Sequence, residues 1–87
     1  MAKVDCLDIP GLVCWFWSND HEPPHFHVKR EGEGELKVNF LANESEMFEL
    51  QWGDTPKAKL RRQIAAAVLA NRAALLVEWQ AKVNHDS

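Results

Sequence analysis

Cysteines are few in this sequence, and long apolar runs are missing. Cys6 and Cys14 have no C-x-x-C spacing and are too few for a disulfide scaffold, so we expect reduced, partly buried thiols. The longest apolar run, residues 12–17, is too short to span a bilayer, which takes about 20 residues. Residues 1–5 lack the basic and apolar regions of a signal peptide. These absences predict a cytoplasmic protein without a membrane segment.

An excess of positive charge is also missing. Lys plus Arg number 10 and Asp plus Glu number 13, which gives a net charge of −3. That balance argues against a surface that binds nucleic acid everywhere, although a local basic patch is compatible with it. The 87 residues make one domain, and 46% of them are hydrophobic, including four Trp and four Phe. The chain can therefore build a core without metals or disulfides.

Motifs for covalent catalysis and phosphate binding are absent too. Ser18 and Ser45 have no nucleophile-elbow pattern around them. Cys14 lies in an aromatic stretch, where a thiol is typical of the core. Gly32 and Gly34 lack the strand–loop–helix context of a phosphate-binding loop and are interpreted as turn residues.

The spacing of apolar residues predicts an α+β fold: a four-stranded antiparallel meander followed by two C-terminal helices packed on one sheet face. The apolar run 12–17 and three alternating segments near residues 26–29, 36–40 and 48–52 are the expected strands. We expect the apolar residues of each alternating segment to share the covered face. Residues 1–10 are interpreted as an irregular lead-in, residues 11–84 as the single ββββαα domain and residues 85–87 as a tail.

The C-terminal third predicts helices. Thr55 can cap a helix and Pro56 fits its first position. Apolar residues recur at helical spacing on both sides of Asn71, which is expected to break or cap the first helix. The alternative is one long helix over residues 56–83, favoured by its alanines. We favour two helices, because one straight helix of that length could not keep both apolar stripes on a small sheet.

The chemically distinctive segment is residues 20–28, Asp-His-Glu-Pro-Pro-His-Phe-His-Val. His25 and His27 are two residues apart on an expected strand, so their side chains share a face, with Cα atoms roughly 6.6 Å apart. We expect this face to be the exposed one, away from the helices. His21 lies in the preceding proline-stiffened loop, so three imidazoles could hold zinc, with Asp20 or Glu22 as a further ligand or orienting group.

Three interpretations of this segment remain open: a zinc site, a metal-free recognition or acid–base site, and ordinary loop and strand residues. The candidate catalytic residues are His25 and His27. The candidate metal ligands are His21, His25 and His27. The expected binding surface consists of Asp20, His21, His25, His27 and Lys29.

Two further features could carry binding. A basic patch on the first expected helix consists of Lys57, Lys59, Arg61 and Arg62. Positive charge at a helix start opposes the macrodipole, so a site for an acidic partner competes with a merely solvated face. Trp15 and Trp17 point to one side of the first expected strand. They either form an exposed ligand or dimer surface or are covered by the first ten residues.

The string D-H-x-P-P-H-F-H-V resembles a bacterial family known only as a domain of unknown function, DUF4160. The resemblance extends from about Gly11 to Lys82. It also includes the Gly-led apolar strand, the Pro-started helix and the C-terminal residues Asn71, Arg72, Leu75, Leu76 and Trp79. It implies that His21, His25 and His27 belong to the family signature, and it brings no established activity.

Members of that family are small prokaryotic proteins often encoded beside another small protein, an arrangement that resembles toxin–antitoxin modules. We therefore expect an interaction module of a two-gene system rather than an enzyme, with a small protein encoded nearby as partner; a homodimer is also compatible. The alternative is a His-based hydrolase or ribonuclease, with or without metal. In it, His25 or His27 is the general base, and Lys29, Arg61 or Arg62 holds a phosphate. A structural zinc, whose removal would unfold the chain, is the third hypothesis.

Overall fold

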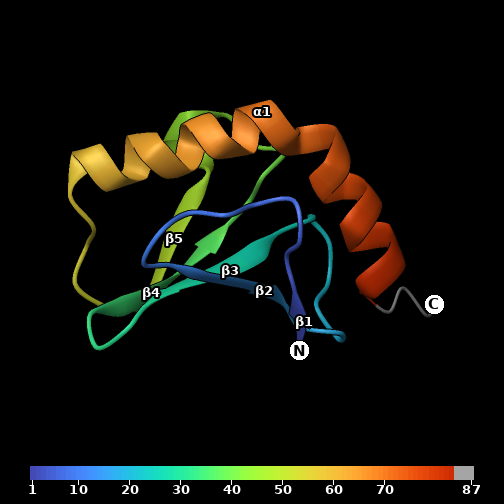
Figure 1. Cartoon of the computed structure of the whole chain (residues 1–87), viewed down its shortest axis with the longest axis horizontal. Helices are drawn as coiled ribbons and strands as arrows, with labels where there is room; N and C mark the ends of the chain where they lie inside the picture. Colours follow the sequence, from blue (N-terminus) through green and yellow to red (C-terminus); the bar gives the residue numbers. More distant parts are fainter. Residues whose placement is uncertain (84–87) are drawn as a thin grey trace.

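A computed structural model describes residues 1–83 of the chain and has the expected α+β class (Figure 1). Five strands form one antiparallel sheet in which neighbours in space are neighbours in sequence, and one helix follows. The elements are β1 (Ala2–Lys3), β2 (Val13–Phe16), β3 (Phe26–Arg30), β4 (Gly34–Val38), the 3₁₀ turn η1 (Glu44–Glu46), β5 (Phe48–Gly53) and α1 (Ala58–Lys82). The predicted domain end at residue 84 and the tail 85–87 lie outside the described residues.

The prediction of four strands is wrong because the first ten residues contribute a fifth. Ala2 pairs with Phe16, and Lys3 pairs with Trp15. A strand of two residues is too short to show alternation, so the sequence pattern could not predict it. The same segment supplies three core residues, Val4, Leu7 and Ile9.

Strands β3 and β4 follow the predicted alternation. Val28 pairs with Leu36 and Phe26 pairs with Val38, and all four side chains are buried in the core. Their neighbours along each strand point to the opposite side, which we call the outer face of the sheet. The outer face therefore carries His27 and the residues opposite it on the adjacent strands, Trp15 and Lys37.

Strand β5 departs from the prediction of one continuous apolar face. Phe48 packs against the core, but Leu50 and Trp52 are 46% and 47% exposed. The pairing shifts by one residue at Glu35 and Leu36, so that Leu50 lies opposite Leu36 while Trp52 lies opposite Glu35. Such a bulge moves the residues beyond it to the other face. Trp52 consequently belongs to the outer face.

The prediction of two helices is wrong as well, because α1 is one helix with a kink. At Asn71, where the sequence predicts a break, the backbone leaves the helical region (φ −127°, ψ 15°). The Asn71 side-chain amide donates a hydrogen bond to the Ala67 carbonyl at 2.8 Å. The kink lets each half of α1 bury its own apolar residues, which a straight helix could not do on so small a sheet; they are Ile64, Ala65 and Val68 before it, and Leu75 and Trp79 after it. The helix begins at Ala58, two residues later than predicted.

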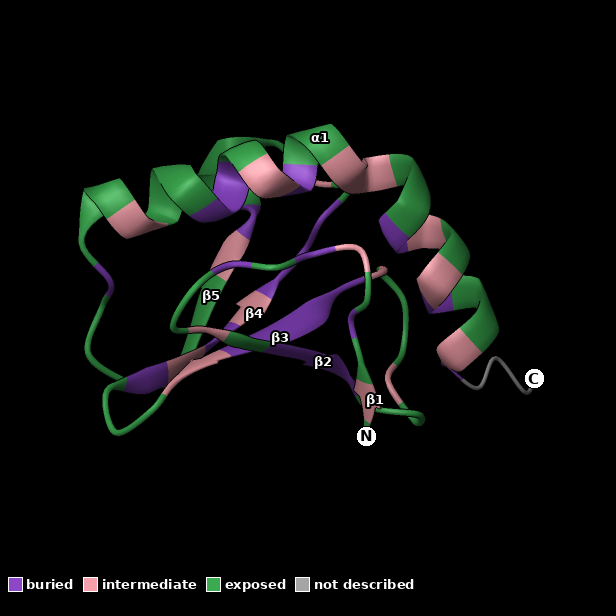
Figure 2. Ribbon diagram, in the orientation of Figure 1, coloured by how far each residue is buried: buried purple, intermediate pink, exposed green. Residues whose placement is uncertain are grey.

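The layers can be followed in Figures 1 and 2. The first half of α1 crosses above the sheet, and the second half bends down beside the end of the sheet where β1 lies. Buried residues occupy β2, β3 and β4 and the sheet-facing side of the helix, whereas β5 is mostly exposed (Figure 2). Within residues 1–83, α1 is too polar for a bilayer-crossing helix, and no other helix has the length. The bend matters for the site because it brings the end of α1 to the loop that precedes β3.

Candidate functional site

The candidate site is built by the loop between β2 and β3. The Asp20 amide donates to the Trp17 carbonyl at 3.2 Å, which closes a turn at the end of β2. The Trp17 amide donates in return to Oδ2 of Asp20 at 3.0 Å. These two bonds hold the Asp20 carboxylate over the start of β3. The loop then continues through the cis Glu22–Pro23 peptide bond to His25.

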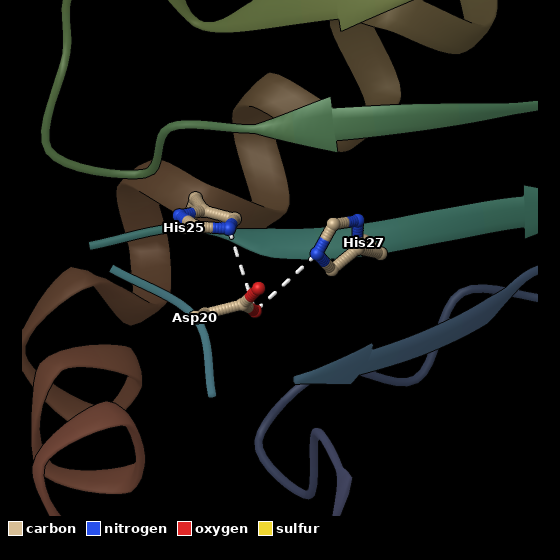
Figure 3. A group of neighbouring side chains, drawn as sticks. All are labelled: Asp20, His25 and His27. Carbon is tan, nitrogen blue, oxygen red and sulfur yellow. Dashed lines mark hydrogen bonds and ion pairs between the residues drawn. The ribbon is translucent and has the colours of Figure 1, made fainter. Parts of the chain in front are cut away.

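Asp20, His25 and His27 meet at this point (Figure 3). Oδ2 of Asp20 lies 3.4 Å from Nε2 of His25 and 3.3 Å from Nε2 of His27. One donor atom from each of the three residues lies within 4.8 Å of the other two. We call these three residues the Asp–His–His cluster.

The prediction that His25 and His27 are exposed is wrong, whereas the predicted face is correct for His27, which lies on the outer face opposite Trp15 and Lys37. The two residues are only 4% and 8% exposed. The His25 ring contacts Trp79 of α1, with ring centroids 5.3 Å apart, because the kinked helix end reaches this edge of the sheet. The imidazole of His27 stacks on the Trp15 indole at 5.5 Å and also meets Trp17 edge-on at 6.4 Å.

Each imidazole also has a neighbour at its other nitrogen. Nδ1 of His25 lies 2.9 Å from the Pro23 carbonyl oxygen. Nδ1 of His27 is buried and lies 3.6 Å from Oε2 of Glu35 on β4. Burial lowers the pKa of His27, and this effect exceeds the raising effect of the Asp20 carboxylate. The His27 imidazole is therefore neutral at pH 7.

A second polar group adjoins the cluster on the outer face. Asn39 is buried and donates from Nδ2 to Oε2 of Glu49 at 2.8 Å, while Lys37 lies 3.7 Å from the same carboxylate oxygen. These contacts lower the pKa of Glu49. Lys37 lies directly opposite His27 in the sheet. The ammonium of Lys37 is paired with Glu49 on β5.

The structure brings together only part of the residues predicted for this region. Asp20, His25 and His27 converge, whereas His21 is exposed and lies outside the cluster. Lys29 is half-buried on the outer face, opposite Val13 and Glu35. The residues that sequence reasoning missed are Trp15, Glu35 and Trp79 as neighbours of the imidazoles. Their contacts depend on strand register and on the helix kink, so no local pattern could have found them.

The predicted basic patch is exposed at the start of α1 and divides into two groups. Lys57 and Lys59 border one hollow together with Arg30. Arg61 and Arg62 border another hollow together with Glu44 and Phe48. The four cations therefore do not line one common surface hollow.

The two cysteines are free, as expected from the sequence. Burial raises the pKa of Cys14 to about 11. Burial, together with the nearby Glu78 carboxylate, raises the pKa of Cys6 to about 12. Both groups remain thiols at neutral pH, which makes them poor nucleophiles.

These features define a small α+β protein with a buried pair of imidazoles joined by one carboxylate. A family model described as "Domain of unknown function (DUF4160)" matches residues 11–80, so the chain belongs to this family and the predicted resemblance is confirmed. The matched range contains the whole Asp–His–His cluster. Comparison with curated proteins and with solved structures gave no match.

The cluster can do two kinds of chemistry. A neutral imidazole next to a carboxylate can take a proton from water or from a substrate hydroxyl. Two imidazole nitrogens and one carboxylate oxygen are also a donor set that transition metals accept. Both kinds use the same three side chains, which makes this loop–strand junction the candidate functional site.

Proposed function

We propose that the protein is a hydrolase whose active centre is the Asp–His–His cluster. The observation that supports this is the convergence of Oδ2 of Asp20 with Nε2 of His25 and of His27 at 3.4 and 3.3 Å. Hydrolysis needs a group that removes a proton from water near neutral pH. A neutral imidazole does this, and burial keeps His27 neutral.

Burial of the Asp–His–His cluster favours a catalytic site over a surface that binds another protein. An interaction surface needs exposed side chains, but His25 and His27 are almost fully covered. A covered site has a low local dielectric, which strengthens the electrostatic interactions on which catalysis depends. The Asp20 side chain keeps 13% exposure, so the cluster is open to solvent from the side of the loop.

The proposed substrates are anionic esters, with RNA as one representative. Lys37 lies opposite His27 on the outer face, and Lys29 follows two residues later on β3. Both cations lie on the same face of the sheet as His27, so they are better placed to hold a phosphate beside it than Arg61 and Arg62, which border another hollow. Of the phosphate-holding residues expected from the sequence, the proposal keeps Lys29, adds Lys37 and leaves out Arg61 and Arg62.

The test is a hydrolysis assay on single-stranded RNA, on bis(4-nitrophenyl) phosphate and on 4-nitrophenyl phosphate. We compare the wild type with His27→Gln and Asp20→Asn, and use His21→Ala as the matched control because His21 is exposed outside the cluster. Loss of a general base lowers the rate by about 10²- to 10⁴-fold, whereas the control should keep the wild-type rate. Far-UV circular dichroism checks that each variant is folded. Absence of turnover by the wild type on all three substrates would count against a hydrolase.

We also propose, as a second candidate, an interaction module of a toxin–antitoxin-like pair. The observation that favours it is the exposure of Trp17 and Trp52, 42% and 47%, both on the outer face. Large exposed aromatics are typical of protein interfaces. The partner proposed is a small protein encoded nearby, and the free thiols fit a reducing cytoplasm.

Co-expression with the neighbouring gene product, followed by size-exclusion chromatography with light scattering, tests the second candidate. A complex should form with the wild type and weaken when Trp17 and Trp52 are both replaced by Ala. Substitution of the exposed helix residue Val77 by Ala serves as a control. A homodimer would appear in the same experiment without the partner. A monomer in the absence and in the presence of the partner would contradict this candidate.

A further inference from the structure

Hydrogen-bond chemistry leaves His25 short of one partner. Its Nδ1 lies 2.9 Å from the Pro23 carbonyl oxygen, which can only accept, so Nδ1 carries a proton. In a neutral ring, Nε2 then has a bare lone pair. That lone pair lies 3.4 Å from Oδ2 of Asp20, which is another acceptor. With a neutral His25 ring, Nε2 and the Asp20 oxygen are two hydrogen-bond acceptors in contact without a proton between them.

His27 has the same difficulty whichever nitrogen carries its proton. Nε2 lies 3.3 Å from Asp20 and Nδ1 lies 3.6 Å from Glu35, so a carboxylate oxygen is near each ring nitrogen. A neutral ring has one N–H and leaves the other lone pair against a carboxylate. Nδ1 is fully buried and makes no hydrogen bond within residues 1–83. The cluster therefore lacks positive charge at its centre.

We propose that a divalent transition-metal ion of the zinc class supplies this charge, bound by Oδ2 of Asp20, Nε2 of His25 and Nε2 of His27. This proposal rests on the proposed hydrolase function and names the cofactor of the same centre. With the ion bound, Nε2 of His27 would be a ligand, and the ion, in place of the free imidazole, would make the water more acidic. Imidazole nitrogen with carboxylate oxygen suits zinc, cobalt and iron, whereas magnesium and calcium prefer oxygen alone.

Two of the three separations between the proposed ligand atoms agree with a tetrahedral metal site, and all three are within 4.8 Å. Zinc lies about 2.0–2.1 Å from imidazole nitrogen and carboxylate oxygen, so two ligand atoms in a tetrahedron are about 3.3–3.4 Å apart. The two separations from Asp20 are 3.3 and 3.4 Å. A direct N–H···O bond is usually about 2.9–3.0 Å. The His27 contact also meets the geometry of a long hydrogen bond, and both separations equal those expected between two ligand atoms of one ion.

The surrounding groups are those that orient metal ligands. A ligating histidine donates its other N–H to a carbonyl or carboxylate, which fixes the ring and leaves the metal-facing nitrogen bare. Pro23 takes this role for His25. For His27 the corresponding carboxylate is Glu35, whose Oε2 lies 3.6 Å from Nδ1, beyond hydrogen-bond distance. The Trp17 amide, 3.0 Å from Oδ2, orients Asp20 in the same way. Three protein ligands leave a fourth tetrahedral position for water, as in catalytic zinc sites.

Protonation alone is a poorer solution. Satisfying both rings with protons would make two imidazolium ions whose centroids are 5.2 Å apart, in a site where both residues are buried. Burial and like charge both oppose this state. One ion, in contrast, satisfies three donor atoms at once.

The test measures Zn²⁺ binding by titration calorimetry and Co²⁺ binding by visible absorption, with untagged protein. His21→Ala/His85→Ala is the reference variant, because it removes the other two histidines as competing ligands. We expect one ion per chain, the intense visible bands of tetrahedral Co²⁺, and unchanged affinity in the reference variant. In that background, Asp20→Asn should weaken binding by more than about 100-fold and Glu35→Gln by about 10- to 100-fold.

Nitrogen NMR of the wild type covers the case in which a buried variant does not fold. Added Zn²⁺ should shift Nε2 of His25 and His27 and leave their Nδ1 protonated. Absence of stoichiometric binding, or shifts confined to His21 or His85, would overturn the metal site. Hydrolysis by metal-free protein would overturn the metal site and leave the proposed hydrolase function standing. Metal binding by a protein that hydrolyses none of the substrates would support the metal site and contradict the hydrolase function.

Discussion

The indole ring of Trp15 covers the imidazole of His27, with centroids 5.5 Å apart and planes inclined by 23°. The two residues are directly opposite each other on β2 and β3. This stacking removes water from one side of the imidazole and so contributes to the burial that lowers the pKa of His27.

Replacing Trp15 by Ala should raise the pKa of His27 towards its ordinary value of 6.5, because water then reaches the ring. Asp20→Asn should have the opposite effect and lower the pKa of His27 below its wild-type value, because the Asp20 carboxylate raises this pKa. Proton NMR titration in metal-free buffer measures both changes. Trp52→Ala, an exposed tryptophan on the same face, is the control and should leave the His27 curve in place. A fall in the His27 pKa in Trp15→Ala would contradict the assigned cause.

His27 also predicts a pH dependence of stability. Its pKa is lower in the folded than in the unfolded chain, so the unfolded chain binds more protons just below pH 6.5. The free energy of unfolding should therefore fall as pH decreases through that range. Urea unfolding of metal-free protein between pH 8 and pH 5 measures this slope, which His27→Gln should reduce. An equal slope in the variant would exclude His27 as its source.

Glu78 provides a second, more acidic transition. Burial alone would raise its pKa, but the hydrogen bonds from Cys6, Lys82 and Asp5 outweigh burial and lower it to about 2. The resulting stabilisation is complete above the ordinary pKa of 4.5 and is lost as pH falls from there towards 2. Glu78→Gln should cost about 2 kcal/mol at pH 7 and much less at pH 3.

Urea unfolding at the two pH values measures this difference. Glu31→Gln, at an exposed turn position, is the matched control and should change stability by less than about 0.5 kcal/mol. A cost of Glu78→Gln that is the same at pH 3 and pH 7 would show that the carboxylate charge does not hold the end of α1 to the segment that follows β1.

The parts of the fold that sequence predicted best are those with long local patterns. Alternation over β3 and β4 places Phe26, Val28, Leu36 and Val38 correctly in the core. The parts that failed depend on distant contacts. Strand β1 has only two residues, the bulge in β5 is set by pairing with β4, and the helix kink keeps two apolar stripes on one small core.

The candidate site shows the same division. The two-residue spacing of His25 and His27 correctly predicts that their rings lie together, and the adjacent Asp20 joins them. Their burial was not predictable, because it comes from Trp15 on another strand and from Trp79, more than fifty residues away in sequence. His21 belongs to the same short segment but is exposed. It directly follows the turn that the Asp20 amide closes with the Trp17 carbonyl.

Substitution of Gly53 tests how closely the end of β5 approaches the start of β4. It has a positive φ of 85°, and an added Cβ would overlap the Glu33 carbonyl and the Gly34 backbone. Gly32 has a similar φ of 75° but open space around the same position. Gly32→Ala should therefore cost about 1 kcal/mol from backbone strain alone, whereas Gly53→Ala should cost about 3 kcal/mol. Equal costs, measured by urea unfolding, would contradict the predicted backbone overlap.

Arg72 connects the helix kink to the site. Its guanidinium donates to the carbonyls of Phe40 at 2.8 Å and Ala42 at 2.6 Å, one residue after the irregular backbone of Asn71. Arg72→Ala removes two charge-assisted bonds and should cost about 2–3 kcal/mol, whereas Arg72→Lys should cost less because one charged donor remains. Arg61→Ala, on the exposed side of α1, is the control for loss of a helix arginine.

The bend held by Arg72 also positions Trp79 against the His25 ring at 5.3 Å. Loosening the bend should therefore change the ring-current shift of the His25 Cε1 proton, even though Arg72 belongs to neither the cluster nor its immediate neighbours. Arg61→Ala should leave that proton unshifted. A His25 signal that stays in place in a folded Arg72→Ala protein would mean that the end of α1 reaches its position without the Arg72 contact. The bonds of Glu78 to Asp5 and of Lys82 to Lys3 would then be sufficient.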